Sequence, residues 1–266
     1  MNKQWAAVGQ ARVFSIVAVA VLSTASANAR ELLEDIVEKT LPLSSSGTFA
    51  LRSIDGTVQI YGSNSNEVKI VAIKKAFSPA RLNGIQVHVD AKEDAVNIST
   101  IAPSKPDWAL SDRSGTIDYI INIPQTVRIV SIDLPTGELV IEGMRGAPIA
   151  ASVGNGRLAT HNCFCDQKMQ ADTGVIDVAF DWLEEQPHSI EVMIDDGNAH
   201  ASIPSDASFE LNAIAENGRV ASDFSEIENR KRGGVSKIHE RIGEAPFSKL
   251  SIRATYGNIR ISEVIW

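Results

Sequence analysis

The stretch Leu134–Leu139, which reads Leu-Pro-Thr-Gly-Glu-Leu, shows a pattern that recurs along this chain of 266 residues. An alternating apolar run leads into a polar turn that ends in glycine, and a second alternating run follows. Further copies include Asp172–Ile176 and Glu216–Val220, and an early copy stands at Asp55–Val58. The glycines of the seven copies are Gly56, Gly137, Gly156, Gly174, Gly197, Gly218 and Gly257.

The residues around these glycines keep fixed positions. Because side chains alternate between the two faces of a strand, apolar residues at every second position predict strands with one buried face. Two residues after the glycines stand Val58, Leu139, Leu158, Ile176, Ala199, Val220 and Ile259. Five residues before them stand Leu51, Ile132, Ala151, Met169, Val192, Ala213 and Ile252. Seven residues before them stand Phe49, Val130, Ile149, Gln167, Ile190, Leu211 and Leu250, of which only Gln167 is polar.

The apolar alternation changes parity at each glycine. The step from the third residue before the glycine to the second residue after it is five, an odd number. Such a slip keeps one face of the chain directed inward only if the chain bends there. Glycine, often preceded by Asn or Asp, supplies the positive φ that a bend of this kind needs.

The spacing of the glycines favours stacked coils. From Gly137 the steps are 19, 18, 23 and 21 residues, ending at Gly218. A period near 20 residues is typical of a solenoid, in which each coil buries its apolar face against its neighbours. The sequence therefore predicts an all-β fold, a parallel β-helix or β-solenoid with coils of about 20 residues. The alternative is an antiparallel β meander or sandwich, because Asn-Gly and Asp-Gly are also strong hairpin turns.

Residues 1–29 have the features of a secretory signal peptide. Lys3 and Arg12 form a positive N-terminal region, Val13–Leu22 an apolar core, and Ala27–Ala29 a small-x-small cleavage signal. The apolar core is shorter than the roughly 20 residues of a membrane span. We therefore expect an exported protein, in the periplasm or at the cell surface, with no membrane span after cleavage.

The chain from residue 30 to residue 266 is acidic. Residues 1–29 hold two basic residues and no acidic one, so 23 of the 25 basic and all 33 acidic residues remain, a net charge of −10. This charge argues against nucleic acid as a partner. The length fits a single domain. We expect a less regular part at 30–124 and regular coils at 125–266.

Both ends of the expected domain carry segments that could cap it. Glu31–Lys39 fits either a short helix or the lead into a first strand. Ile261–Trp266 is apolar enough to pack against the other end or to pair with another chain. Solenoid ends expose strand edges, so homo-oligomers through these edges are a further expectation.

The order of motifs resembles a known family. The chain carries Glu38–Thr40, Asp55–Ile60, Val68–Lys75 and Ile117–Pro124, then the glycine coils, and closes with Thr255–Ile261. This order is similar to that of the bacterial putative-adhesin family of domains of unknown function, exported β-solenoids whose repeats read Asn-Gly-x-Ile/Val-x-Ile/Val. The resemblance covers the chain from about Glu38 onward. It implies a parallel β-helix in the cell envelope, with no established activity and no catalytic residue to carry over, and fold alone does not fix function.

One segment departs from the repeat. Residues 223–243 interrupt the period, so that 39 residues separate Gly218 from Gly257. Excursions from a solenoid often carry specific contacts, which makes this segment a candidate interaction loop. The alternative is a solvated insertion.

Cys163 and Cys165 are the only cysteines, and His161 precedes them. In an oxidising compartment two cysteines often pair, although a pair separated by one residue closes a small and strained ring. The alternatives are inert thiols at a coil corner or, with His161, a metal site that would need a ligand from elsewhere. We expect a disulfide or redox pair and assign no metal or cofactor.

Acidic residues recur near the expected corners. A polysaccharide-active β-helix enzyme would use such carboxylates as acid, base or Ca²⁺ ligands, whereas ordinary turn chemistry also explains them. They are Asp133, Asp172, Asp177, Asp195 and Asp196. The aromatic residues Phe180 and Trp182, with Leu183, fit either a small satellite core or a face that contacts sugar or protein.

These observations together favour a non-catalytic, adhesin-like binding or scaffold module at the cell envelope. Its expected partner is an envelope protein or a glycan. The alternatives are the polysaccharide-active enzyme and a thiol- or metal-sensing envelope component that uses Cys163 and Cys165.

Overall fold

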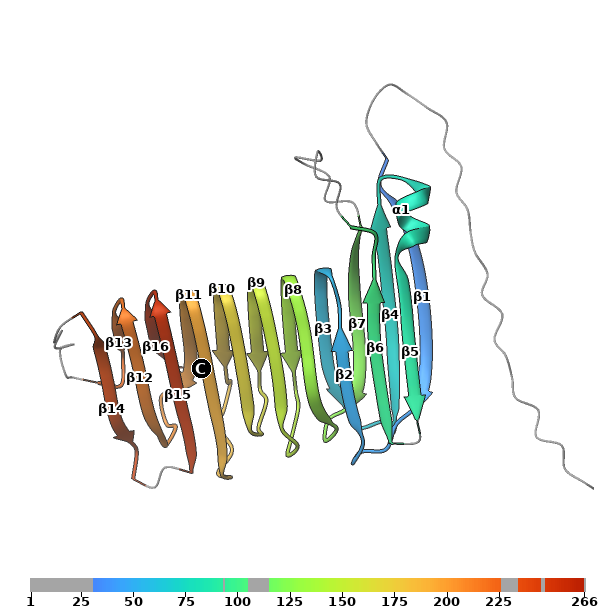
Figure 1. The fold of residues 1–266 in the computed structure, drawn as a ribbon. Helices are drawn as coiled ribbons and strands as arrows, with labels where there is room; N and C mark the ends of the chain where they lie inside the picture. The colour runs from blue at the N-terminus through green and yellow to red at the C-terminus, as the bar shows by residue number, and fades with distance from the viewer. Residues whose placement is uncertain (1–30, 93, 105–114, 226–233, 245–246, 266) are drawn as a thin grey trace, which may run out of the picture. The chain divides into compact units, whose positions relative to one another are not determined.

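The computed structural model describes residues 31–92, 94–104, 115–225, 234–244 and 247–265 (Figure 1). Leu32–Trp266 forms one compact unit. In the described part, sixteen strands and one helix follow one another along the chain. They are β1 (Leu33–Pro42), β2 (Thr48–Arg52), β3 (Asp55–Ser63), β4 (Glu67–Ala76), α1 (Pro79–Gly84), β5 (Gln86–Lys92), β6 (Ala95–Ile101), β7 (Thr116–Pro124), β8 (Arg128–Glu142), β9 (Ile149–His161), β10 (Gln167–Ala179), β11 (His188–Pro204), β12 (Phe209–Asn217), β13 (Val220–Ser222), β14 (Ser236–Ile242), β15 (Ser248–Tyr256) and β16 (Ile259–Val264).

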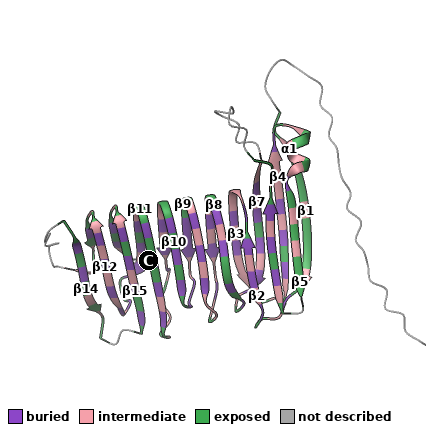
Figure 2. Cartoon of the chain, viewed as in Figure 1, coloured by how far each residue is buried: buried purple, intermediate pink, exposed green. Residues whose placement is uncertain are grey.

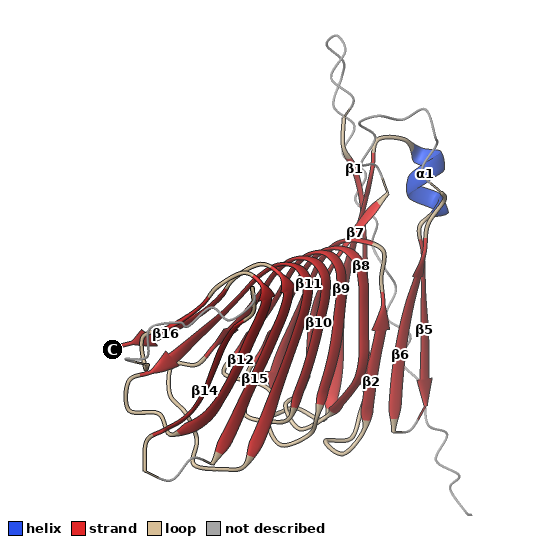
Figure 3. Cartoon of the chain, turned by 60° about the vertical axis from the view of Figure 1, so that its left-hand side comes forward, coloured by secondary structure: helices blue, strands red, loops and turns tan. Residues whose placement is uncertain are grey.

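The strands belong to one mixed sheet, which confirms the expected all-β fold. Strands β8, β9, β10 and β11 pair in parallel, the pairing expected between neighbouring coils. Each of them bends at its glycine, as the arches in Figure 3 show. The halves before the glycines form a first layer, in the order β5-β6-β2-β8-β9-β10-β11-β15-β12-β14. The halves after the glycines form a second layer, in the order β1-β4-β7-β3-β8-β9-β10-β11-β16-β13.

The bends are stacked glycine on glycine. Gly137 pairs with Gly56 and with Gly156, and the same register continues through Gly174 to Gly197. Gly156 has a φ of +144°, which only glycine adopts readily. A Cβ on Gly156 would lie 1.8 Å from the carbonyl oxygen of Gly137. The recurring glycine thus meets two requirements, a backbone conformation and the close approach of the neighbouring coil.

Gly218 is an exception to the predicted turn conformation. Its φ lies outside the positive region in which the other six repeat glycines are found. A Cβ there would nevertheless lie 1.7 Å from the carbonyl oxygen of Gly257. The glycine at 218 is therefore required by the close approach of the next coil and not by a left-handed bend.

The predicted apolar positions form the core. Every residue two after or five before a repeat glycine is buried, at 5% exposure or less, and Figure 2 shows the buried residues alternating along the strands. The position seven before the glycine differs in one copy. Val130 is 51% exposed, because an irregularity in β8 between Ile129 and Ile132 directs Ile129 inward instead. Gln167 is buried and donates from Nε2 to the carbonyl oxygen of Cys163 at 2.7 Å.

Both ends of the sheet contain antiparallel strands. The segment 31–39 enters a strand and not a helix, since β1 pairs antiparallel with β4. At the other end, β14 pairs antiparallel with β12. The predicted excursion at 223–243 therefore includes an edge strand, while its residues 226–233 lie outside the described part of the chain.

The last coil is inserted between two earlier ones. β15 lies between β11 and β12, and β16 lies between β11 and β13. The C-terminal segment Ile261–Trp266, of which Trp266 lies outside the described residues, therefore begins inside the sheet. Ile261 is buried between β11 and β13, whereas Ser262–Val264 pair with β11 alone. The 39 residues that separate Gly218 from Gly257 include β13, β14 and β15.

Candidate functional site

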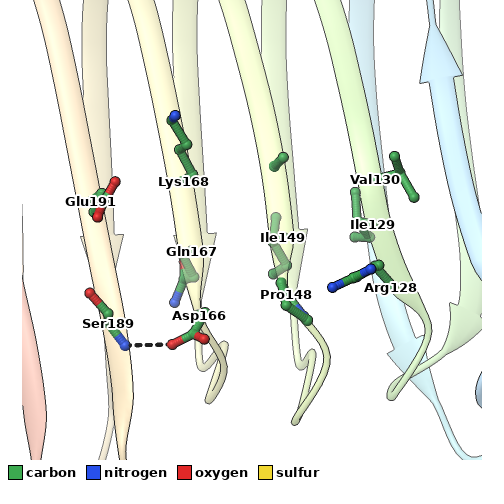
Figure 4. Close-up of a pocket in the computed structure, with 11 residues that line it drawn as sticks. Arg128, Ile129, Val130, Pro148, Ile149, Asp166, Gln167, Lys168, Ser189 and Glu191 are labelled. Atoms are coloured by element: carbon green, nitrogen blue, oxygen red, sulfur yellow. Dashed lines mark hydrogen bonds between the residues drawn. The ribbon is translucent and has the colours of Figure 1, made fainter.

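An open groove of about 430 Å³ crosses the outer face of the first layer (Figure 4). It spans β8, β9, β10 and β11 near the starts of these strands. Two rows of outward residues border it, and each row takes one residue from each coil in register. The rows are Arg128, Pro148, Asp166 and Ser189, and then Val130, Ala150, Lys168 and Glu191.

The local sequence explains why the face is hollow here. Before its glycine bend, strand β9 presents only small residues outward, namely Ala150, Ser152 and Gly154, between longer side chains on β8 and β10. The irregularity in β8 places Val130 at the surface, so an apolar side chain lies beside Ala150. The result is a trough with an apolar centre.

Charged groups of both signs surround this trough. The Arg128 side chain extends toward Pro148 (Figure 4). On β10, the exposed Lys168 lies two residues after Asp166, whose carboxylate accepts a hydrogen bond from the Ser189 amide at 2.8 Å. Glu191 stands at the β11 end. A ligand in the groove would therefore meet a cation at the β8 end and a carboxylate at the β11 end.

A second, smaller pocket of about 160 Å³ contains the aromatic residue that the sequence singled out. Trp182 is 48% exposed and Phe247 is 44% exposed, and both line this pocket. Glu184, Glu185 and Asp206 add carboxylates. Half-exposed rings beside carboxylates fit a sugar or a cation. Phe180 lies in the core, as the satellite-core alternative expects, whereas the half-exposed Trp182 leaves the contact face a prediction.

The outer face of the second layer carries a chain of ion pairs. Arg157 donates to Glu138 at 2.7 Å and to Asp177 at 2.6 Å. Asp177 also lies 3.1 Å from Nδ1 of His200. The hydrogen bonds to both carboxylates raise the pKa of Arg157. These groups satisfy one another across four neighbouring strands. We call them the ion-pair ladder; it holds neighbouring coils together and offers no free charge to a ligand.

His161 lies between two carboxylates of neighbouring coils. Its Nε2 is 3.0 Å from Asp181, and its Nδ1 is 3.4 Å from Glu142. Burial opposes the charged imidazolium, but the hydrogen bond and charge of Asp181, with the charge of Glu142, outweigh it and raise the pKa of His161. The hydrogen bonds from His161 and Asn162 lower the pKa of Asp181.

The raised pKa of His161 predicts a pH-dependent contribution to stability. A histidine whose folded pKa exceeds its unfolded value stabilises fully below about pH 6.5, and this contribution is lost as the pH rises through the folded pKa. We expect His161→Gln to lower the free energy of unfolding by less than about 1 kcal/mol at pH 5.5, because His161 and its two carboxylate partners are partly exposed. At pH 8.5 the loss should be smaller still. Urea unfolding of both proteins at the two pH values measures this. A difference that grows with pH would contradict the assignment. Burial lowers the pKa of His188. This histidine is present in both proteins, so its contribution to the pH dependence cancels in the comparison.

Cys163 and Cys165 lie in the core as free thiols. They are 0% and 3% exposed, and Cys163 Sγ lies 3.5 Å from the carbonyl oxygen of Ile141. Burial raises the pKa of Cys163 to about 11 and raises that of Cys165 as well. Since the thiolate is the reactive form, this environment favours inert thiols. The disulfide or redox pair remains a prediction.

A thiol titration decides between these alternatives. We expect the native protein to react only slowly with a thiol reagent, and two thiols to react once it is unfolded in denaturant, because the burial and the raised pKa are then lost. One disulfide in the freshly purified protein, seen as no reactive thiol even in denaturant, would contradict inert thiols. Fast labelling in the native state would contradict them equally.

The corner carboxylates are not gathered into a pocket. Asp133 pairs with Arg52 at 3.1 Å, and Asp177 belongs to the ion-pair ladder. Asp172 and Asp195 lie side by side on β10 and β11, exposed like Asp196. Among the residues that the structure describes, no group of three or more His, Cys, Asp or Glu side chains is placed to hold a metal ion.

The comparisons with known proteins identify no family. No protein-family model matches the chain, and no curated protein matches it. Solved structures that match the chain include a putative cell adhesion protein from Clostridium sporogenes, with 14% identity, 86% of this chain and 100% of that chain covered, and a TM-score of 0.47. Another is a putative adhesin from Bacteroides fragilis, with 11% identity, coverage of 86% and 97%, and a TM-score of 0.30. A putative lipid binding protein from Parabacteroides distasonis has 7% identity, coverage of 87% and 97%, and a TM-score of 0.30.

Proposed function

We propose that this chain is an exported, non-catalytic, adhesin-like β-solenoid that binds a protein in the periplasm or at the cell surface. The groove across β8–β11 is the observation that carries the proposal. Export rests on the signal-peptide pattern of residues 1–29, which lie outside the described part of the chain. Within the described part, no helix is both long and apolar enough to cross a membrane.

The dimensions of the groove suit an extended polypeptide. Three inter-strand spacings separate β8 from β11, which makes the groove about 14 Å long, the length of about four extended residues. Its apolar centre at Val130 and Ala150 would accept an aliphatic side chain. Arg128 would meet a carboxylate of the ligand and Glu191 a basic group, so electrostatic complementarity would fix the direction of the bound segment.

Charge exchange in the groove tests this function. The variant Arg128→Glu/Glu191→Lys keeps the net charge but reverses both ends of the groove. Arg219→Glu/Glu263→Lys exchanges two exposed charges away from the groove, one in the turn before β13 and one on β16, and is the matched control. The full chain, recovered from the envelope fraction, is used to isolate a partner, whose affinity is then measured with each purified protein.

We expect the groove variant to weaken binding about tenfold or more, and the control to bind like wild type. Equal affinity of the groove variant and the control would refute the groove as the binding site. Consumption of a soluble glycan by the wild-type protein would refute the non-catalytic assignment, and Asp172 and Asp195 would then be the first residues to replace.

The pocket at Trp182 and Phe247 supports a second candidate function, glycan binding. The two half-exposed rings provide stacking faces, which the groove across β8–β11 lacks, since no aromatic residue lines it. A glycan array distinguishes protein binding in the groove from glycan binding at Trp182 and Phe247. Retention of a glycan that is lost in Trp182→Ala and kept in Arg128→Glu/Glu191→Lys would favour the second function.

A further inference from the structure

We infer that strand β1 is a self-complementary edge through which two copies of this chain form a symmetric dimer. β1 (Leu33–Pro42) lies at the end of the second layer and pairs on one side only, with β4. The second layer has three strands beyond the first glycine coil, namely β7, β4 and β1, whereas the first layer has only β6 and β5 (Figure 1). The free edge of β1 therefore extends one strand beyond the other layer.

The core-facing side chains of β1 complement themselves when two copies of the strand pair antiparallel. The row that faces the core reads Leu33, Asp35, Val37, Lys39 and Leu41, since Val37 and Leu41 stand opposite the buried Ala72 and Val68. In an antiparallel pair of two β1 strands centred on Val37, Leu33 faces Leu41 of the second copy, and Asp35 faces Lys39. Val37 faces Val37. Every cross-strand pair in this row is therefore apolar with apolar or acid with base.

Of the two charges in this row, Lys39 can pair directly with a second copy, whereas the Asp35 carboxylate would be shared with Lys74 of its own chain. The Lys39 ammonium makes no ion pair or hydrogen bond with another residue in the described part of the chain, and Lys39 is exposed. Asp35 is 2.5 Å from Lys74, and its side chain is still 50% exposed. Ile36, on the opposite face of β1, is 51% exposed. The unpaired backbone N–H and C=O groups of this edge are a template for strand addition, and the inward charges Asp35 and Lys39 restrict that addition to a strand with complementary charges.

The edge at the other end of the sheet does not self-pair in this way. The outward row of β14 is Lys237, His239 and Arg241. An antiparallel pair of two β14 strands centred on His239 would bring Lys237 against Arg241, a repulsive contact. Pairing of β1 with β1 is closed by a two-fold axis, so the proposal commits to a dimer and not to a filament.

A mixing experiment tests the dimer. Lys39→Asp places two carboxylates opposite each other at both ends of the interface, and Asp35→Lys places two amines there. Each variant, recovered from cells that express the full chain, is studied by analytical ultracentrifugation alone and as an equimolar mixture. The control Lys92→Asp changes an exposed charge on the edge strand β5.

We expect wild type and Lys92→Asp to dimerise alike, and each β1 variant alone to associate at least about tenfold more weakly, because the repulsion acts twice. The mixture should recover the wild-type association constant, since a heterodimer restores both Asp–Lys pairs. Repair of a folding defect could not produce this rescue. A monomeric wild type, loss of the dimer in Lys92→Asp, or variants that dimerise normally would overturn the proposal.

Cross-linking at a single position gives an independent readout of the register. Val37→Cys faces its own copy at about 5 Å between Cβ atoms and should form a disulfide-linked dimer under mild oxidation. Glu34→Cys should not, because its two copies lie six residues apart along the pair, about 20 Å. A cross-link at Glu34 and none at Val37 would overturn the register.

Discussion

Replacing Gly156 by alanine is expected to lower the free energy of unfolding by about 3 kcal/mol or more, measured by urea denaturation. Two causes add up at this position. The φ of +144° belongs to a region that is essentially reserved for glycine, and the new Cβ would lie 1.8 Å from the carbonyl oxygen of Gly137. The collision is with backbone, so it can be relieved only if two paired coils separate.

Gly146 offers a matched control. It has a φ of +73°, and a Cβ at this position would have nothing within 4 Å. Gly146→Ala should therefore cost only the left-handed conformation, about 1 kcal/mol. Equal losses of stability in Gly146→Ala and Gly156→Ala would show that the stacking of the glycine bends is not a structural requirement.

The second large effect is expected at Phe164, which we predict to cost about 4 kcal/mol of unfolding free energy when it is replaced by alanine. Phe164 is 1% exposed, and its ring centroid lies 5.5 Å from that of Phe180 and 5.4 Å from that of Trp182. The Arg145 guanidinium carbon lies 4.9 Å from the centre of the Phe164 ring. Alanine would leave a cavity behind Trp182 and remove these contacts.

Trp182→Ala is the comparison for this prediction. The Trp182 side chain is about half exposed, so its removal should cost about 1 kcal/mol. Urea unfolding measures both variants. If Trp182→Ala were the more destabilising of the two, the core of this corner would centre on Trp182, and the pocket beside it would be a structural feature and not a candidate glycan site.

Much of the core can be predicted from the sequence, because the glycine repeat fixes positions relative to itself. Leu139 and Ile132 are buried as the repeat predicts, and so are their equivalents in the other copies. The prediction fails at Val130 because the irregularity in β8 locally shifts the alternation of buried and exposed residues. The residue types in this stretch do not indicate such a shift.

The order of the coils could not be predicted. A repeat implies that each coil stacks on the preceding one, yet β15 and β16 enter between β11 and the pair β12 and β13. Neighbouring coils present equivalent apolar faces, so the repeat pattern alone cannot distinguish one stacking order from another. The long interval before Gly257 was predicted as an interaction loop or a solvated insertion, and part of it is the strand β14.

The candidate site depends on the register between coils. Arg128, Asp166 and Ser189 are spread over about 60 residues of sequence and carry no motif. They come together only because β8, β9, β10 and β11 pair in parallel with their glycines aligned. The small outward residues of β9, beginning with Ala150, are the one signal in the sequence that could have located the groove.

The most direct test of the binding function uses a photo-cross-linking amino acid at Ala150, in cells that express the full chain. Lys69, which is exposed on the outer face of β4 in the second layer, is the control position. We predict one discrete adduct in the envelope fraction from position 150, absent from position 69 and abolished by Arg128→Glu/Glu191→Lys. No adduct at position 150, or the same adducts from both positions, would contradict a protein-binding groove on this chain.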